Sequence, residues 1–98
     1  MIGEFRDLWL LEFFEHDVHS RHIPPDLEAR LFRKLQIIDD ATSERDLREP
    51  PGNRYEKLWG QLDGYHSIRV NQQWRLVFQW DNGRGRAMDM YLDDHSYH

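Results

Sequence analysis

Apolar and polar side chains alternate along residues 66–80 and predict two adjacent strands of one hairpin. The apolar members recur at every second position on either side of a short polar turn, at Ile68, Val70, Trp74, Leu76, Phe78 and Trp80. This period of two is typical of strands that bury one face. If both apolar sets face one core, the register is restricted to pairings of equal parity, such as Ile68 opposite Leu76. Arg69 then lies directly across from Arg75.

This arginine pair is the first indication of function. Like charges opposite each other on a sheet face are unfavourable, so the guanidinium groups are either neutralised internally or offered to an anion. The planar fork of arginine suits phosphate, and we predict a phosphate site at Arg69 and Arg75. The alternative is a solvated sheet face in which Asp89 or Asp93 pairs with them. Equal parity with the last strand brings Arg75 opposite Asp93 or Tyr91.

Two amphipathic helices are expected before the hairpin. Apolar residues at helical spacing indicate a first helix from Asp7 to about His19. A second helix should start at Pro24-Pro25, because proline is tolerated in the first helical turn. Phe32 is expected to widen its buried stripe. The stripe itself consists of Leu27, Leu31, Leu35 and Ile38.

Further strands complete the predicted sheet. A short edge strand is expected at 1–6, and strands at 54–58 and 88–93 flank the hairpin. The last strand is expected to place on one face Met88, Met90 and Leu92. The fold class is therefore α+β: a short N-terminal strand, two helices, then a four-stranded, mainly antiparallel meander with the helices packed on one face.

Length and composition limit the class of protein. A chain of 98 residues suits a single domain, 1–98. With 13 basic and 18 acidic residues the formal net charge is −5, whereas a general nucleic-acid binder is usually basic. An RNA site must therefore be a local patch, such as the segment 54–75 with its four basic and two acidic residues. The absence of cysteine excludes disulfides and thiolate chemistry. Without a secretory signal or an apolar run of roughly 20 residues, we expect a cytoplasmic protein without membrane contact.

Several motifs, in order along nearly the whole chain, carry a resemblance to one family. They are Ile23-Pro24-Pro25, the helix end 37–42, the segment 50–54, the string Ser67-Ile68-Arg69-Val70-Asn71 followed by Gln73-Trp74-Arg75, and the terminal acidic and histidine residues. In these motifs the chain resembles the host-inhibition-of-growth (HigB-type) toxins of the RelE/ParE superfamily. The hairpin string is the specific part of the resemblance.

The resemblance implies a bacterial type II toxin that cuts mRNA in the ribosomal decoding site. A helix-turn-helix antitoxin would neutralise it, and operator DNA would be contacted only through the antitoxin complex. The family's chemistry needs no metal or other cofactor. A 2′-hydroxyl attacks the adjacent phosphate, helped by a general base, an arginine that stabilises the phosphorane, and a general acid that protonates the leaving 5′-oxygen. Arg75 matches that arginine, and Arg69 matches many members.

Other positions depart from the family pattern. Glu56 and Trp59 stand where relatives often have histidine and lysine. Members of the family tend to end in Asp-Tyr-His. One alignment places the aspartate of this motif at Asp94, and an alignment shifted by one residue places its aspartate at Asp93 and its histidine at His95. The predicted catalytic residues are Arg75, His95, Asp94, Asp93 and Glu56, of which His95 suits acid or base chemistry near neutral pH. The predicted RNA-binding residues are Arg69, Lys57, Arg54, Tyr91 and Tyr97, the tyrosines as stacking platforms for bases.

Plainer interpretations stand beside these. Spacing fixes no paired set of metal ligands among His16, His19 and His22, so we expect a polar helix end there. Arg30, Arg33 and Lys34 form a solvated helix face or contact ribosomal RNA. Two other functions are open: a ParE-like inhibitor of DNA gyrase without nuclease chemistry, and a weakly active toxin relic that acts through antitoxin binding and operator repression.

Overall fold

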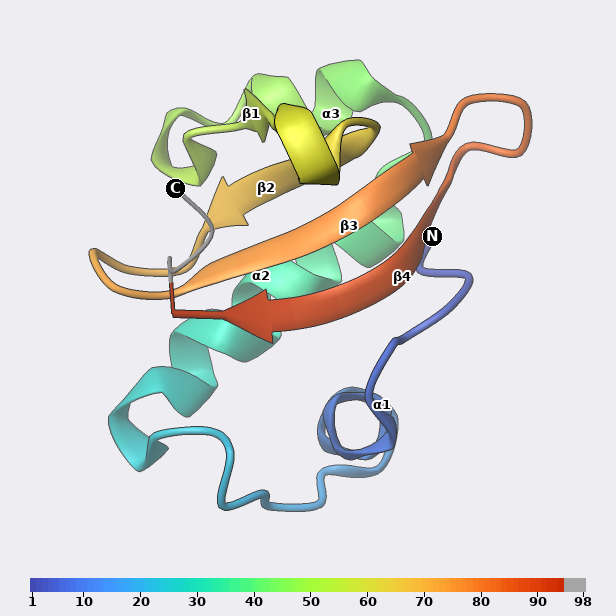
Figure 1. The fold of residues 1–98 in the computed structure, drawn as a ribbon. Coiled ribbons are helices and arrows are strands. Elements are labelled where there is room, and N and C mark those ends of the chain that lie inside the picture. Colours follow the sequence, from blue (N-terminus) through green and yellow to red (C-terminus); the bar gives the residue numbers. More distant parts are fainter. Residues whose placement is uncertain (95–98) are drawn as a thin grey trace.

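The computed structural model describes residues 1–94, which form three helices and one four-stranded sheet (Figure 1). The helices are α1 (Leu8–His16), α2 (Glu28–Asp40) and α3 (Glu44–Arg48), and single 3-10 turns lie at Pro25–Leu27, Pro51–Asn53 and Gly60–Leu62. The strands are β1 (Glu56–Lys57), β2 (Tyr65–Arg69), β3 (Arg75–Asp81) and β4 (Arg86–Asp93). Within this described part, no helix is long and apolar enough to cross a lipid bilayer.

The four strands lie side by side in chain order, β1-β2-β3-β4, and each pairs antiparallel with the next. Figure 1 shows α2 lying across one face of this sheet, behind β3 and β4. The predicted α+β architecture, with helices followed by a meander, is confirmed. We call the face packed on α2 the inner face and the opposite one the outer face.

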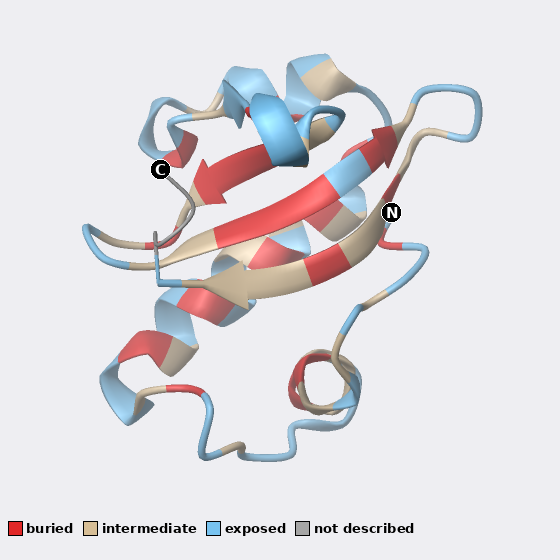
Figure 2. Ribbon diagram, viewed as in Figure 1, coloured by how far each residue is buried: buried red, intermediate tan, exposed pale blue. Residues whose placement is uncertain are grey.

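The core lies between α2 and the inner face, where buried segments follow the centre of the sheet (Figure 2). The predicted stripe is confirmed, because none of its members is more than 2% exposed: Leu27, Leu31, Leu35 and Ile38. The expectation for Phe32 is wrong, since this side chain is 43% exposed. It follows Leu31 by one residue, which turns it about 100° around the helix and away from the sheet. There its ring contacts those of Phe13 and Phe14.

The predicted hairpin register is confirmed, with Ile68 opposite Leu76 and Arg69 opposite Arg75. Asn71 closes the turn, because its Oδ1 accepts hydrogen bonds from the backbone N–H groups of Gln73 and Trp74, each at 2.8 Å. Such an asparagine turn replaces backbone hydrogen bonding where the chain reverses. The turn therefore holds the register that the apolar pattern selects.

Several predicted element boundaries differ from the structure. Helix α2 begins at Glu28, after a 3-10 turn at Pro25–Leu27, and β4 begins at Arg86, two residues before the predicted start. The segment 1–6 forms no strand but joins β4 by two parallel bridges, Ile2 to Ala87 and Phe5 to Met90. Helix α1 ends at His16, before the predicted His19, because Asp17 takes the left-handed conformation (φ 55°) that terminates helices. Strand β1 has two residues in place of the predicted five, and the left-handed residue Arg54 (φ 47°) precedes it.

Strand β4 contains a bulge that the period-two pattern does not predict. Tyr91 lies opposite Val77, but Met88 lies opposite Gln79, so the register shifts between these pairs. Asp89 has a positive φ of 54° at this irregularity. An extra residue in one strand reverses the faces beyond it. Ala87 is therefore fully buried while Met88 lies beside the outward Gln79, and the expectation that Met88 shares the core face of Met90 is wrong.

Gly85→Ala should lower the free energy of unfolding by about 1 kcal/mol or more, since alanine is strained at positive φ. Gly85 has φ +65°, and an added Cβ would lie 2.7 Å from the backbone oxygen of Thr42. Gly83→Ala in the same loop is the control, because its Cβ would lie 3.4 Å from Asp81 Oδ1 and its φ is not positive. Urea unfolding of both variants measures the difference. Equal stabilities would contradict the assigned role of Gly85.

Candidate functional site

Two rows of side chains cross the outer face. Arg69, Arg75 and Asp93 lie opposite one another on β2, β3 and β4. The neighbouring row runs from Glu56 through Ser67 and Val77 to Tyr91. Because residues two apart on a strand share a face, both rows lie on the side away from α2. The two rows bring seven residues together on this face, and five of them were predicted as site residues: Arg69, Arg75, Asp93, Glu56 and Tyr91.

Arg75 is the central group of this surface. Its Nε and Nη1 atoms are shielded from solvent and have no hydrogen-bond partner within residues 1–94. A buried charged donor without an acceptor costs free energy, of the order of 1–3 kcal/mol or more. Arg69 directly opposite adds repulsion between like charges. An anion placed here would pair with both guanidinium groups at once. Phosphate suits this position because its oxygens accept the paired N–H hydrogen bonds that arginine donates.

The other residues of the two rows differ in exposure. Glu56 is exposed on β1, and Tyr91 and Asp93 are half-buried on β4. Asp94 is exposed directly after the end of β4. His95 and Tyr97 lie outside the described residues, so the structure gives no position for these two predicted groups.

Lys57 and Arg54 do not lie in the two rows. Lys57 follows Glu56 by one residue and therefore points to the inner side, where its Nζ lies 3.9 Å from Glu44 Oε2. Arg54 is exposed at the edge of the sheet and lines a separate hollow together with Arg69. A role of either side chain at Arg75 itself is therefore not supported by their placement.

A network that the sequence did not indicate supports Tyr91. Arg6 donates from Nε and one terminal nitrogen to the two carboxylate oxygens of Asp89, at 3.0 and 2.7 Å. Its guanidinium carbon lies 3.8 Å from the centre of the Tyr91 ring. The Tyr65 hydroxyl also donates to Asp89, and its ring contacts Tyr91 edge-on. The hydrogen bonds from Arg6 lower the pKa of Asp89, so the carboxylate is charged at neutral pH.

This network depends on the bulge of β4. The positive φ of Asp89 turns its carboxylate toward the N-terminal segment, which brings Arg6 onto the ring of Tyr91. A guanidinium stacked on an aromatic face gives a planar, cationic surface of the kind on which RNA bases stack. Arg6, Tyr65 and Asp89 therefore belong to the candidate site although no motif indicated them. The apolar pattern gave no signal for them, because Ala87 and Met88 are both apolar and either could face the core.

A second network lies on the inner side of β1 and β2. The Tyr55 hydroxyl donates to Glu44 Oε2 at 3.2 Å and lies 2.6 Å from Nδ1 of His66. A hydroxyl has one proton, so while it donates to Glu44 the Nδ1 of His66 must carry a hydrogen and donate to the hydroxyl. Burial, followed by the charge of Glu44, raises the pKa of Tyr55, and burial lowers the pKa of His66. This network anchors β1 to α3 and lies away from Arg75.

His66 should make the protein less stable in mild acid. Its pKa is lower in the folded than in the unfolded chain, so the unfolded state binds more protons below about pH 6.5. The free energy of unfolding should therefore fall as the pH drops from 7.5 to 5.5. Urea unfolding at several pH values should show a smaller fall in His66→Asn, which keeps a donor but does not titrate.

His19→Asn is the matched control for this pH dependence. The hydrogen bond to Glu28 raises the pKa of His19, so its contribution has the opposite sign and is lost as the pH rises. Removing His19 should therefore steepen the acid loss or leave it unchanged. A pH dependence that is the same in His66→Asn as in the wild type would contradict the assignment.

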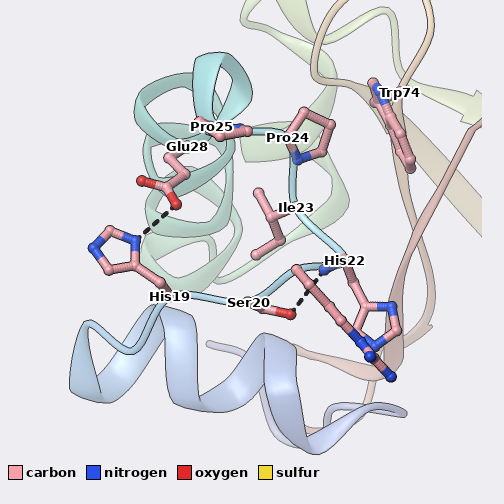
Figure 3. A pocket seen from close by; sticks show the side chains of 9 residues that line it. His19, Ser20, His22, Ile23, Pro24, Pro25, Glu28 and Trp74 are labelled. Atoms are coloured by element: carbon pink, nitrogen blue, oxygen red, sulfur yellow. Dashed lines mark hydrogen bonds and ion pairs between the residues drawn. The ribbon is translucent and has the colours of Figure 1, made fainter.

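A pocket lined by His19 and His22 does not bring these histidines together as metal ligands. It has a volume of about 720 Å³ and lies at the connection between α1 and α2 (Figure 3). His19 Nδ1 lies 2.9 Å from Glu28 Oε2, whereas His22 stacks on Trp9 with ring centres 4.8 Å apart. Across residues 1–94 no group of three or more histidine, aspartate or glutamate side chains is placed to hold a metal ion.

Comparison with known proteins gives consistent matches over nearly the full chain. Residues 3–95 match the family described as the RelE-like toxin of type II toxin-antitoxin system HigB. The chain is 55% identical to Toxin HigB-1 of Vibrio cholerae over 97 residues, which is 99% of this chain and 100% of the relative. It is 35% identical to Endoribonuclease HigB of Proteus vulgaris over 95 residues, covering 97% of this chain and 100% of the relative.

Solved structures share the fold. The YoeB dimer of Staphylococcus aureus superposes with a TM-score of 0.54 at 22% sequence identity, covering 99% of this chain and 97% of the other. The YoeB-YefM complex of the same organism gives a TM-score of 0.54 at 21% identity, covering 92% and 94%. At this level of identity the superpositions establish the architecture alone. They agree with the helices and antiparallel sheet described above.

Proposed function

This chain belongs to the HigB family of RelE-like toxins of type II toxin-antitoxin systems, and from that premise we propose that it arrests growth by cutting mRNA on the ribosome. The observation that carries the proposal is the pair of outward arginines, one of which, Arg75, buries two donors without a partner among residues 1–94. The name of the Proteus relative, an endoribonuclease, supports the same chemistry.

The reaction needs one phosphate and its neighbouring 2′-hydroxyl at the outer face. A base takes the hydroxyl proton, the 2′-oxygen bonds to phosphorus, and the bond from phosphorus to the 5′-oxygen breaks. The products are a 2′,3′-cyclic phosphate and a 5′-hydroxyl, which receives its proton from a general acid. Arg75 would stabilise the negative charge that accumulates on the phosphorane oxygens, and Arg69 would hold the phosphate from the neighbouring strand.

Proton transfer is assigned to groups at the two ends of the rows. Glu56 on β1, in the row next to that of Arg75 on the outer face, is one candidate for the base. His95, by family resemblance, is the other candidate for base or acid, with Asp93 and Asp94 as the carboxylates that orient it. Tyr91, stacked under Arg6, would hold a base of the RNA, and Tyr97 is assigned the same role by resemblance.

The partners follow from the family. A solved neighbour is described as a heterotetrameric complex of the YoeB-YefM toxin-antitoxin of Staphylococcus aureus, which supports an antitoxin as the partner of this chain. We assign it a helix-turn-helix antitoxin of the HigA type, through which alone it would reach operator DNA, and the ribosome as the place of cleavage. The proposed location is the cytoplasm. No cofactor and no membrane contact are part of the proposal.

The test is expression of the chain in bacteria with and without the neighbouring antitoxin gene, followed by mapping of mRNA 5′ ends. We expect growth arrest and new mRNA ends with the toxin alone, and neither when the antitoxin is present. Arrest with DNA-damage signalling but without new mRNA ends would overturn the proposal in favour of gyrase inhibition. Normal growth with a stable antitoxin complex would overturn it in favour of a relic that acts only in repression.

A further inference from the structure

A hollow at the edge of the sheet gathers five basic side chains. It has a volume of about 460 Å³ and lies where α2, the turn at Pro51–Asn53 and the end of β2 meet. The basic residues that line it are Arg30, Arg33, Lys34, Arg54 and Arg69. None of its lining residues is acidic. We call this feature the basic hollow.

The lysine of the basic hollow is held in place. Lys34 Nζ donates to Asn53 Oδ1 at 2.7 Å, and the fully buried Asn53 donates from its side chain to the backbone oxygen of Leu47 at 2.9 Å. Gly52 lies close to the ammonium, since an added Cβ there would be in van der Waals contact with Nζ at 3.6 Å. A fixed and partly desolvated cation is costly without an anion. Burial and the neighbouring Arg33 lower the pKa of Lys34 accordingly.

The basic hollow is not neutralised from within. None of its five cations makes an ion pair in the described part of the chain, although the sequence has 18 acidic and 13 basic residues. Of the eight other lysines and arginines, four pair with a carboxylate in the described part of the chain: Arg6, Arg45, Arg48 and Lys57. In an acidic protein, five unpaired cations around one hollow indicate an external anion.

We propose that the basic hollow binds backbone phosphates of single-stranded RNA that extends from the Arg75 site. This inference rests on the proposed function. Arg69 belongs to both places, because it lines the hollow and lies opposite Arg75, so one strand can pass from the outer face around the sheet edge to α2. An acidic peptide fits less well, since apolar side chains contribute only Pro51 and Val70 to the lining. A basic surface with little apolar lining is typical of proteins that bind the phosphate backbone of a nucleic acid.

The experiment measures binding of a short 2′-O-methyl RNA, which lacks the attacking hydroxyl, to the full chain freed of antitoxin. Fluorescence anisotropy at about 50 to 200 mM salt gives the slope of log K against log salt. Arg30→Ala/Arg33→Ala should reduce that slope by about 1.4, because each phosphate contact on a single strand contributes about 0.7. If the plots of log K against log salt for the wild type and the variant meet near 1 M salt, the variant binds RNA roughly 25-fold more weakly at about 0.1 M salt.

Arg45→Ala/Arg84→Ala is the matched control, since it removes the same charge from exposed arginines outside the basic hollow. It should bind as the wild type does. An unchanged slope in Arg30→Ala/Arg33→Ala, or no RNA binding by the wild-type chain, would overturn the inference. Weaker capture of the antitoxin by Arg30→Ala/Arg33→Ala, with unchanged RNA binding, would also overturn the inference. That result would assign the basic hollow to antitoxin binding.

The two proposals fail separately in this design. If Arg75→Ala abolishes the new mRNA ends in cells while Arg30→Ala/Arg33→Ala leaves the salt slope unchanged, the nuclease proposal stands and the basic hollow is not an RNA site. If the hollow variant weakens RNA binding although the wild-type chain makes no new mRNA ends, the hollow binds RNA in a protein with another activity.

Discussion

Arg75→Ala is expected to lower RNA cleavage by about 10²–10³-fold, the loss typical of removing one group that stabilises charge in a transition state. Its stability should equal or exceed that of the wild type. The reason is that Nε and Nη1 of Arg75 are buried without partners among residues 1–94, and that Arg69 lies directly opposite. Growth arrest and mapped mRNA ends measure the first effect, and thermal unfolding measures the second.

Two further variants make this test specific. Arg75→Lys keeps the charge but loses the planar fork, and we expect it to recover only part of the activity. Arg45→Ala removes an exposed arginine that pairs with Glu49, and it should leave toxicity unchanged. Toxicity that survives Arg75→Ala would refute the phosphate assignment. A variant that loses both toxicity and antitoxin capture would instead indicate a structural role for Arg75.

Leu76→Ala is expected to lower the free energy of unfolding by about 2–5 kcal/mol, a large part of the 5–15 kcal/mol typical of a small domain. Leu76 is fully buried between its hairpin partner Ile68 and Leu92 on β4. Removing its side chain leaves a cavity beneath the strand that positions Arg75. Urea unfolding at neutral pH measures the loss.

The same substitution at an exposed leucine separates cavity formation from a general effect of alanine. Leu8 is 68% exposed, so Leu8→Ala should change the free energy of unfolding by no more than about 0.5 kcal/mol. Similar losses in Leu8→Ala and Leu76→Ala would contradict the assignment of Leu76 to the core. A lower midpoint with an unchanged denaturant slope in Leu76→Ala would show that the fold itself is retained.

The arginine pair could be predicted because the alternative register carries a large penalty. A slip by one residue would reverse one strand relative to the other, turning either Ile68 or Leu76 to solvent and bringing Arg69 or Arg75 into the core. The stripe of α2 could be predicted for a similar reason, since its leucines recur at one helical period. These two patterns determine the sheet, its inner face and the outward direction of Arg75.

The surroundings of the pair depend on contacts between distant residues. Ala87 and Met88 are both apolar, so the pattern does not reveal which one faces the core, and the bulge is associated with a contact between Asp89 and Arg6, 83 residues away. Arg30 and Arg33 have the spacing of an ordinary solvated helix face. Only the folded chain brings them beside Arg69, which is why the basic hollow was not predicted as one site.

Both lateral borders of the sheet are partly blocked against the addition of another strand. On one border β1 offers only two residues, both charged and exposed, which is a common protection against aggregation through backbone pairing. On the other, the bridges at Ile2 and Phe5 cover the first half of β4. Self-assembly into fibrils by edge-to-edge pairing is thereby obstructed, and trimming residues 1–6 would uncover a ladder of unpaired amides and carbonyls on β4.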